Sequence, residues 1–403
     1  MTTIRPNNTA DLFFQLTWHS RNVRHTDTYA GHMVNFWRDL LPRRLSTDLW
    51  ERQAGDRLEW RLAPEELFTN GQARDVRRLR KAQFDPERIG APHITPRLGR
   101  FYPKGLLADV ANVFIANREP FRCVQIDDDR LGVDMGHPLA ETPLTLNITV
   151  GAVSPKSEER GGTTRDWMET ITHGVGMQAR WNDQPTDFFS DTPFSRQDEA
   201  PDPLFYAKPR LVRHLDDTAV DMVRQLYGRF LAQDMRVLDL MSSWESHLPA
   251  GVAFKQVSGV GLNAYELEKN GALSDFRVQD LNANPALPYA DGLFDAIVCT
   301  ASVEYLTDPW AVLAEAARVL RPGGYLIVTF SNRWFPPKAI ALWSELHEFE
   351  RMGLVLEYFH RSGSFTDLQT YSVRGLKRPR HDKYFGEIAS SDPIYAVWGQ
   401  KMG

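Results

Sequence analysis

Cysteine is scarce in this sequence: the 403 residues include only Cys123 and Cys299, which lie far apart and inside apolar runs. Two such residues argue against a disulfide framework, and they lack the paired spacing of a zinc site. Free thiols are typical of a reducing compartment. We therefore expect a cytoplasmic protein with no bound metal.

Long hydrophobic runs are missing as well. No apolar stretch approaches the roughly 20 residues that a membrane-spanning helix needs. The N-terminal segment MTTIRPNNTADLFF lacks the basic region and the apolar core of a secretion signal. We expect no membrane association.

Charge of one sign is not in excess either, since 47 Lys and Arg residues stand against 52 Asp and Glu residues, for a net charge of -5. A mildly acidic chain has no general electrostatic footprint for nucleic acid, so we expect no such partner. The basic cluster RDVRRLRKAQF, which starts at Arg74, is better explained as a solvated face than as a binding surface.

The chain does contain enough apolar material for sizeable cores, 42% of its residues, and more length than one core normally holds. Changes of pattern divide it into a domain over 1–153, a linker over 154–202 and a domain over 203–403. The linker starts polar, but it then contains aromatic residues that are costly to leave in water, so we expect it to pack partly on a domain surface. These residues are Trp181, Phe188, Phe189 and Phe194. The oligomeric state stays open.

The C-terminal half alternates strand-like and helix-like segments, which is typical of a parallel sheet covered by helices. One helix is expected over 308–324, because Asp308 can cap it, Pro309 suits its first turn and Gly323-Gly324 can end it. Seven segments read as strands: RVLDL (236–240), VSGVGL (257–262), FRVQDL (276–281), FDAIVCT (294–300), YLIVTF (325–330), LVLEYFH (354–360) and IYAVWG (394–399).

The segment LPYADGLFDAIVCTASVEYLTDPWAVLAEAARVLRPGGYLIVTF resembles class I S-adenosylmethionine-dependent methyltransferases, and the resemblance extends over about 205–401. It implies a seven-stranded Rossmann-like α/β domain with an antiparallel last strand. It also implies an enzyme that takes a methyl group from S-adenosylmethionine, leaves S-adenosylhomocysteine and acts on a small-molecule substrate.

The first strand, RVLDL, is followed by Met241-Ser242-Ser243-Trp244-Glu245-Ser246-His247 instead of a glycine-rich turn. Several glycines are needed where the backbone closes on a pyrophosphate, but S-adenosylmethionine has no phosphate. The chain also resembles a methyltransferase type 11-like group in which a Ser-Ser-Trp-x-Ser-His turn replaces the glycine motif. We therefore favour retained cofactor binding over a cofactor-free scaffold.

The resemblance assigns parts of the cofactor to individual residues. Asp239 would face its cationic portion, Asn263 stands where the family usually has an acid that grips both ribose hydroxyls, and Asp280 would bind the adenine amino group. Tyr206 and Arg210 would cover the methionine end. The predicted cofactor-binding set is Asp239, Met241, Ser242, Ser243, Trp244, Leu262, Asn263, Asp280, Leu281, Thr300, Ala301, Tyr206 and Arg210.

Methyl transfer is an in-line displacement that needs alignment and a water-poor site, so a general base is optional. Polar residues near the strand ends are the catalytic candidates: His247, His214, Tyr305 and Arg333. Each also has a structural explanation, such as a helix cap for His247 or a surface ion pair for Arg333. No paired-acid site and no Asn/Asp-Pro-Pro-aromatic signature follows strand four, which favours S-methylation of a small thiol or sulfide. Oxygen and nitrogen acceptors are the alternatives.

The N-terminal half has short strands separated by turns, which indicates an antiparallel barrel or half-barrel: FFQLTW, DRLEWRL, FRCVQID, RLGVDM and LTLNITV. The piece VDMGHPLAETPLTLNI resembles an FKBP-type prolyl isomerase of the SlyD-like branch, whose flap carries a chaperone insert. The proline pocket has few counterparts here beyond Asp27, Phe36 and Trp37, so we expect little or no isomerase activity. The alternative function is a prolyl isomerase, chaperone or interaction protein with a structural methyltransferase-like domain.

Overall fold

The computed structural model describes residues 2–68, 74–155 and 162–403. Its contacts divide the chain into two compact units. The first unit contains 1–21, 27–190 and 349–354, and the second contains 22–26, 191–348 and 355–403. The predicted domain limits near 153 and 202 stay a prediction. Within the described ranges, no helix is long and apolar enough to cross a bilayer.

The second unit is built on a sheet whose strands follow the order β11-β10-β9-β12-β13-β15-β14. The five strands from β11 to β13 are parallel, and β15 is antiparallel to both of its neighbours. The antiparallel last strand is as expected. The strands are β9 (Arg236–Leu240), β10 (Gln256–Gly261), β11 (Asp275–Val278), β12 (Phe294–Thr300), β13 (Leu320–Phe330), β14 (Phe365–Arg374) and β15 (Ile394–Lys401).

The sheet contains more than the seven expected strands. The strand next to β14 in the order is β2 (Val23–Asn35), and its first residues belong to this unit. His25 Nδ1 lies 2.8 Å from Thr370 Oγ1 of β14, and both side chains are fully buried. The resemblance described 205–401 alone, and a strand supplied by the beginning of the chain lay outside it.

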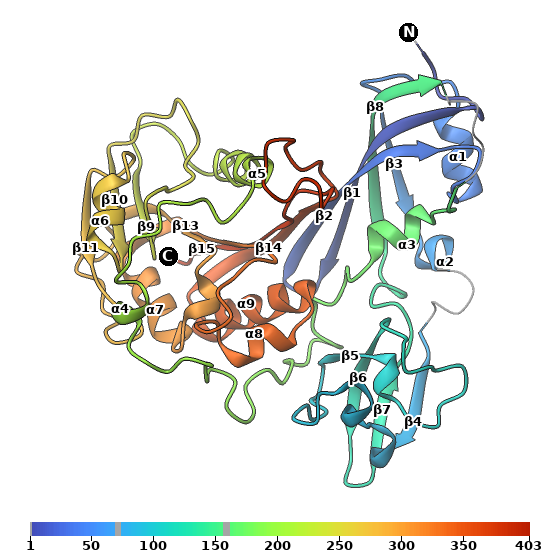
Figure 1. Ribbon diagram of the computed structural model, residues 1–403, viewed down its shortest axis with the longest axis horizontal. Helices are drawn as coiled ribbons and strands as arrows, with labels where there is room; N and C mark the ends of the chain where they lie inside the picture. Colours follow the sequence, from blue (N-terminus) through green and yellow to red (C-terminus); the bar gives the residue numbers. More distant parts are fainter. Residues whose placement is uncertain (1, 69–73, 156–161) are drawn as a thin grey trace. The chain divides into compact units, whose positions relative to one another are not determined.

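Helices cover both faces of these strands, with α5 on one side and α7 to α9 on the other (Figure 1). Helix α5 packs on alternate residues of the strands, such as Val237, Val298 and Ile327. On the other face, Trp343 of α8 meets Phe330 of β13 with ring centroids 5.0 Å apart. The helices of this unit are α4 (Asp202–Phe205), α5 (Asp217–Tyr227), α6 (Ala264–Lys269), η4 (Val303–Tyr305), α7 (Pro309–Val319), α8 (Ala341–Glu345) and α9 (Glu348–Ser362), the last of which is shared with the first unit.

The start of the helix predicted over 308–324 is confirmed. The Asp308 carboxylate accepts from Ala311 N at 3.1 Å, and Pro309 is the first residue of α7. The helix ends at Val319, before the glycines, because Leu320 already pairs with Phe294 of β12.

The strand predicted at 354–360 is wrong. These residues lie in the middle of α9, and the strand follows as β14. Six of the seven residues are buried. A helix that is buried on most sides shows an unbroken apolar run, which periodicity cannot distinguish from a buried strand.

The first unit is mostly β, as predicted, but it has two sheets rather than one barrel. The strands β2, β1, β8 and β3 follow β14 in that order in the eleven-stranded sheet, and the other sheet has the order β4-β7-β6-β5 (Figure 1). Its strands are β1 (Asn8–Ser20), β3 (Arg57–Leu62), β4 (Val76–Arg80), β5 (Phe101–Pro103), β6 (Pro120–Ile126), β7 (Arg130–Asp134) and β8 (Leu144–Pro155), together with most of β2. Its helices are α1 (Arg43–Leu49), α2 (Pro64–Leu67), η1 (Lys81–Gln83), η2 (Pro86–Ile89), η3 (Lys104–Leu106) and α3 (Trp167–Thr172).

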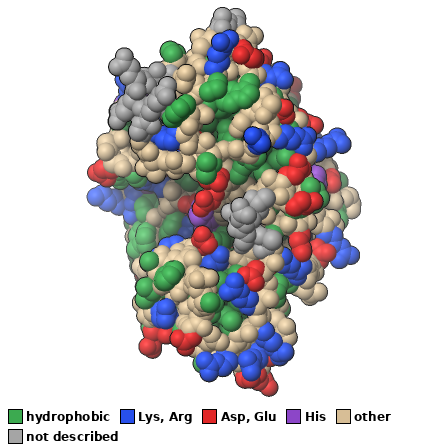
Figure 2. Space-filling view, turned by 90° about the vertical axis from the view of Figure 1, so that its right-hand side faces the viewer, with side chains coloured by type: hydrophobic (Ala, Val, Ile, Leu, Met, Phe, Trp, Pro, Cys, Tyr) green, Lys and Arg blue, Asp and Glu red, His purple; other side chains and the backbone are tan. Residues whose placement is uncertain are grey.

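The basic cluster that starts at Arg74 lies on and before β4, and acids pair with it. Arg74 binds Glu141 at 2.8 Å, Arg77 binds Asp75 at 2.6 Å, and Arg78 binds Asp127 at 3.1 Å. Basic and acidic side chains are intermixed over the face drawn in Figure 2. The cluster is therefore largely neutralised by its own neighbours.

The predicted linker over 154–202 packs partly, as expected. In the first unit, Phe188 is buried, and the Arg74 guanidinium lies 4.3 Å from the Trp181 ring. In the second unit, Phe194 meets Trp310 of α7 with ring centroids 5.2 Å apart. The polar start of the linker includes 156–161, which lie outside the described residues.

Candidate functional site

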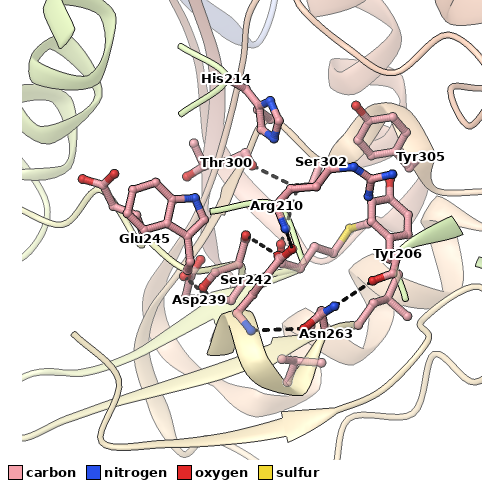
Figure 3. A pocket seen from close by; sticks show the side chains of 18 of the residues that line it. Tyr206, Arg210, His214, Asp239, Ser242, Glu245, Asn263, Thr300, Ser302 and Tyr305 are labelled. Atoms are coloured by element: carbon pink, nitrogen blue, oxygen red, sulfur yellow. Dashed lines mark hydrogen bonds between the residues drawn. The ribbon is translucent and has the colours of Figure 1, made fainter. Parts of the chain in front are cut away.

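A pocket of the second unit opens at the edge where the parallel strands β9 to β12 end. Asp239 of β9, Gly261 of β10 and Thr300 of β12 line it, together with Asp280, which follows β11. In an open α/β sheet, ligands bind at the carboxyl ends of the strands. Figure 3 shows Asp239 and Thr300 in this pocket together with Tyr206 and Arg210, which come from a preceding segment.

The turn after β9 is held by side chains in place of glycines. Ser242 Oγ donates to Asp239 Oδ2 at 2.5 Å. Asn270 Nδ2 donates to Ser246 Oγ and to the Ser243 carbonyl, each at 2.8 Å. Met241 and His247 adopt positive φ values of 57° and 51°, which residues other than glycine adopt only when their surroundings impose them. Side-chain hydrogen bonds therefore hold the turn in this conformation although it has no glycine.

Asp239 lies under the pocket and is 3% exposed. Burial raises the pKa of its carboxyl to about 6, and the Ser242 hydrogen bond opposes part of this rise. The acid is therefore only modestly stabilised as an anion near neutral pH.

The end of β10 approaches this turn closely. Ser242 N donates to the Val260 carbonyl at 2.7 Å, and a Cβ on Gly261 would clash with the Ser242 carbonyl oxygen. Asn263 caps α6 by accepting from Glu266 N at 3.1 Å. Its amide Nδ2 donates to the carbonyls of Tyr206 and Ala207, at 2.8 and 3.2 Å. This side chain therefore anchors the preceding segment, which the sequence analysis did not foresee.

We call residues 206–214 the cover segment, because they form one wall of the pocket. Arg210 lies among aromatic rings, with its guanidinium carbon 4.6 Å from the Phe205 ring centroid and 5.3 Å from that of Phe335. One guanidinium nitrogen donates to the Phe205 carbonyl at 3.1 Å, and the Arg210 backbone N donates to Glu266 Oε1 at 2.6 Å.

His214 lies at the end of the cover segment, with its ring 5.0 Å from that of Phe335. Partial burial, followed by the Arg210 charge, lowers the pKa of His214. The imidazole is therefore neutral at neutral pH and can accept a proton.

Glu245 is an ionic centre that joins the cover segment to the turn. Its carboxylate accepts two bonds from Arg213, at 2.7 and 3.0 Å, and one from Arg224 of α5 at 2.7 Å. His247, followed by Arg213, lowers the pKa of Glu245 to about 2. His247 Nδ1 is 3.8 Å from Glu245 Oε1, which is beyond hydrogen-bond range. We therefore ascribe the connection between the turn and the cover segment to the arginine contacts of Glu245. Trp244 Nε1 adds a bond to the Val212 carbonyl at 3.3 Å.

Beyond β11 and β12, the pocket wall is a polar network. Asp280 Oδ1 accepts from Asn282 N at 3.0 Å. Asn282 Nδ2 donates to Asp202 Oδ2 at 2.8 Å and to the Tyr305 carbonyl at 2.9 Å. Asp202 also pairs with Arg196 at 2.7 Å. This network fixes the chain after β11 against the first residue of α4.

Tyr305 is 7% exposed, and its hydroxyl oxygen accepts from Phe335 N at 2.9 Å. Burial raises the pKa of Tyr305 well above its ordinary value. The phenol therefore stays protonated, and it is a hydrogen-bonding group rather than a base at neutral pH.

The structure gathers nearly all of the predicted site residues into this one pocket. All thirteen predicted cofactor-binding residues line it, as do His214, His247 and Tyr305. Their roles stay a prediction.

Arg333 does not line this pocket. It borders another cavity, where Nη1 is 3.6 Å from Asp392 Oδ1 and the guanidinium lies over the Tyr384 ring. After β13 the chain turns so that Phe335 reaches the pocket instead. A catalytic role for Arg333 therefore finds no support in its position.

Sequence reasoning missed several polar lining residues: Asp202, Glu245, Glu266, Gln279 and Asn282. Glu245 lies inside the unusual turn, and Glu266 lies three residues after the α6 cap. An acidic residue at each of these two positions could have been recognised in the sequence as a candidate pocket residue.

Comparisons with known proteins point to the same part of the chain. A family model described as a methyltransferase domain matches residues 246–328. The demethylmenaquinone methyltransferase of Mycolicibacterium paratuberculosis is 37% identical over 86 residues, 18% of this chain and 37% of that protein. The ubiquinone biosynthesis O-methyltransferase of Xanthomonas axonopodis pv. citri is 39% identical over 77 residues, 18% of this chain and 29% of that protein. The chain thus spans about a third of the length of these curated relatives.

Solved structures of S-adenosylmethionine-dependent methyltransferases also align with the chain. One from Archaeoglobus fulgidus has a TM-score of 0.33 and 14% identity, over 46% of this chain and 94% of that chain. One from Aquifex aeolicus has a TM-score of 0.31 and 18% identity, over 47% and 92%. The matched segment 246–328 runs from the turn after β9 into β13, so it includes β10, β11 and β12, three of the four strands that end at the pocket. It supports a methyltransferase domain, with S-adenosylmethionine as cofactor, in the C-terminal half.

Proposed function

We propose that this protein is an S-adenosylmethionine-dependent methyltransferase that acts on a small molecule. The observation that carries the proposal is the pocket at the carboxyl ends of β9 to β12, part of whose lining comes from the segment 246–328 that matches a methyltransferase domain. A cytoplasmic location remains part of the proposal.

The pocket residues fit the cofactor chemically. Asp280 Oδ1 already accepts from the backbone N of Asn282, and an amino group of adenine is a suitable donor to the same carboxylate. Leu281 is buried beside it and offers an apolar surface. Gly261 lines the pocket at the end of β10, where it lets the turn after β9 pack closely against the strand. When bound, S-adenosylmethionine supplies the methyl group.

The chain's own residues would orient the acceptor and exclude water. Phe335, Tyr305 and Tyr206 form an aromatic wall, with ring centroids 6.2 to 6.5 Å apart. His214, neutral at pH 7, is the group on this wall that can take a proton from an acceptor. Such a wall suits a compact, partly apolar acceptor.

For the acceptor we propose a small thiol or sulfide, methylated on sulfur. A thiol loses its proton near neutral pH, so one neutral imidazole such as His214 is sufficient help. The two relatives named above are called a demethylmenaquinone methyltransferase and a ubiquinone biosynthesis O-methyltransferase. Hydroxy compounds of quinone type are therefore the acceptors to compare with thiols.

For the first unit we propose an FKBP-like identity without efficient isomerase activity. The sheet β4-β7-β6-β5 lies in sequence between β3 and β8, in the way that an inserted domain interrupts a flap. Asp27, one of the few counterparts of a proline pocket, is 3% exposed and bonded to Trp18 Nε1 at 2.9 Å, whereas Trp37 is 51% exposed.

The first experiment is a calorimetric titration of the full chain with S-adenosylhomocysteine. We expect micromolar or tighter binding, and a loss of more than about tenfold in Asp239→Ala, because that variant removes the partner of Ser242 in the turn. Asp291→Ala is the matched control, since Asp291 lies on the surface beside Arg318. Folded protein that releases no heat would contradict the proposal.

A second assay tests the acceptor. The full chain is incubated with S-adenosylmethionine and with matched thiol, hydroxy and amino compounds, plus sulfide, and methylated products are counted. We expect turnover of thiols and a large decrease in His214→Ala. Product from a hydroxy or amino compound alone would refute the sulfur acceptor and leave the methyltransferase proposal standing.

A further inference from the structure

We propose that the methyl acceptor carries a carboxylate and that the guanidinium of Arg210 binds this carboxylate. This inference rests on the proposed function, because it assumes that the pocket methylates a small thiol. It narrows that acceptor to a thiol that is also a carboxylic acid. It also moves Arg210 from the methionine end of the cofactor, where sequence analysis placed it, to the acceptor.

The guanidinium of Arg210 lies in a box of aromatic rings. Its central carbon is 4.6, 5.7 and 5.3 Å from the ring centroids of Phe205, Tyr206 and Phe335. One nitrogen donates to the Phe205 carbonyl at 3.1 Å. Aromatic faces stabilise the positive charge, but they do not satisfy the N–H donors that lie in the plane of the guanidinium. Donors therefore remain for a further acceptor in this plane.

The acids of the pocket are engaged with other groups. Asp202 pairs with Arg196, and Glu245 pairs with Arg213, each at 2.7 Å. Glu266 accepts from the backbone N of Arg210, at 2.6 Å, and not from its guanidinium. Among the residues that the structure describes, no carboxylate forms an ion pair with the Arg210 guanidinium. The acids that line the pocket are Asp202, Asp239, Glu245, Glu266 and Asp280.

A carboxylate is the group that fits these donors best. It is planar like the guanidinium, and two parallel N–H···O bonds between the two groups are among the strongest hydrogen-bonded contacts in proteins. A guanidinium between rings is partly shielded from water, which strengthens its attraction for an anion. An amide or a hydroxyl would form only neutral acceptor bonds at the same place.

The Arg210 charge acts on the aromatic wall rather than on the turn after β9. Burial dominates the pKa of His214 and of Tyr305, and the Arg210 charge lowers both. Burial also dominates the pKa of Asp239 at the turn, where His247 is the neighbour whose charge lowers it. The turn would hold the methionine end, so Arg210 is better placed for the acceptor.

The surroundings of His214 are mostly positive. After burial, the Arg210 charge is the largest influence that lowers the pKa of His214. Arg333 and Lys383 act in the same direction, and Glu266 acts against them. An anionic acceptor is therefore electrostatically favoured at this end of the pocket.

The base and the anion site flank one ring. The Phe335 centroid is 5.3 Å from the guanidinium carbon of Arg210 and 5.0 Å from the His214 ring centroid. Figure 3 shows Arg210, His214 and Tyr305 in the same pocket. A small molecule whose thiol and carboxylate are separated by a few carbon atoms can thus contact both groups.

The test compares two thiols of equal length on the full chain, 3-mercaptopropionate and 3-mercaptopropionamide, with S-adenosylmethionine as methyl donor. We expect the wild-type protein to methylate the acid with a kcat/KM at least about 30-fold higher, because the amide cannot form charge-assisted bonds to the guanidinium. In Arg210→Met, which keeps an apolar stem, this ratio should fall below about threefold, mainly through a higher KM for the acid.

Arg229→Met is the matched control. Arg229 is exposed and its guanidinium carbon lies 4.6 Å from the Tyr371 ring centroid, so it also stacks on an aromatic ring, but it does not line the pocket. This variant should keep the wild-type ratio. Arg210→Lys keeps the charge without the planar fork and should retain part of the ratio. It takes the place of Arg210→Met if the melting curve shows that Arg210→Met does not fold.

Calorimetry separates the acceptor from the cofactor. S-adenosylhomocysteine carries a carboxylate, and 5′-methylthioadenosine does not. We expect Arg210→Met to change the affinity for each of them by less than about threefold, since no hydrogen bond to either is lost. A loss of more than about tenfold for S-adenosylhomocysteine alone would show that Arg210 holds the cofactor, and it would overturn this inference.

The remaining outcomes are distinct. Equal kcat/KM for acid and amide in the wild-type protein, or an unchanged ratio in folded Arg210→Met, would overturn this inference while the proposed function stands. If neither thiol is methylated, their binding to the complex with S-adenosylhomocysteine is measured, and equal affinity or no binding overturns the inference. Failure of the wild-type protein to bind S-adenosylhomocysteine at all would refute the proposed function and this inference with it.

Discussion

At the scale of single residues, the site contains a buried aspartate, Asp239, whose pKa is raised. Asp239 is 3% exposed, and burial raises the pKa of its carboxyl to about 6. In the unfolded chain the pKa of an aspartate carboxyl is about 4. The folded protein therefore holds this proton more firmly than the unfolded chain does, and ionisation of Asp239 works against folding.

The sign of the pH effect follows directly. Between about pH 4 and 6 the folded state binds more protons, so the contribution of Asp239 to stability falls as the pH rises, by on the order of 3 kcal/mol in total. We expect Asp239→Asn to melt at a higher temperature than wild type at pH 7, with an advantage that shrinks towards pH 4. Melting curves across this range, with Asp291→Asn as surface control, measure it. Parallel curves for wild type and Asp239→Asn would contradict it.

At the scale of elements, the turn after β9 works without glycine because other elements hold it. Glu245 connects it to the cover segment through Arg213 and to α5 through Arg224. Asn270 binds it from the end of α6. A turn fixed from three sides can keep strained φ angles that a free loop would lose.

We expect Glu245→Gln to bind S-adenosylhomocysteine about five to twentyfold more weakly, because the charge-assisted bonds to Arg213 and Arg224 become neutral ones. Titration calorimetry measures the change. Asp221→Asn is the matched control: it removes the other carboxylate of Arg224, at 3.2 Å, and leaves the turn untouched. An unchanged dissociation constant in Glu245→Gln would show that the tether does not shape the pocket.

At the scale of the whole molecule, the chain joins a methyltransferase-like unit to a mostly β unit. The methyltransferase-like unit also contains residues 22–26, from the beginning of the chain, and the mostly β unit contains 349–354. Each unit therefore depends on residues far away in the sequence. Truncation at the predicted limits near 153 and 202 would remove strand or helix residues from both.

Prolyl isomerase activity of the full chain should be weak or absent, because the Asp27 carboxylate is buried and accepts a hydrogen bond from Trp18, and because Trp37 is half exposed to solvent. A proline-peptide assay over a range of protein concentrations checks this expectation. Rapid, catalytic turnover that Trp37→Ala abolishes would contradict it and would favour the isomerase or chaperone alternative.

Local sequence patterns were sufficient to predict most of the strands that we expected, one helix start and the position of one site residue. The strand segments of both halves other than 354–360, the cap at Asp308 and the position of Asp239 at a strand end follow from alternation, capping chemistry and apolar runs within a few residues. Parallel strands share one edge, so the residues after them meet there, and this is why nearly all predicted site residues line one pocket.

Tertiary structure alone decided the rest, because these features depend on contacts between residues far apart in sequence. The run at 354–360 became helix since it is buried on most sides, and Arg333 turned to Asp392 at 3.6 Å while Phe335 entered the pocket. Asn263 was drawn to the carbonyls of the cover segment, some 56 residues earlier. That contact holds the cover segment beside the end of β10, and spacing along the chain does not encode a contact between residues so far apart.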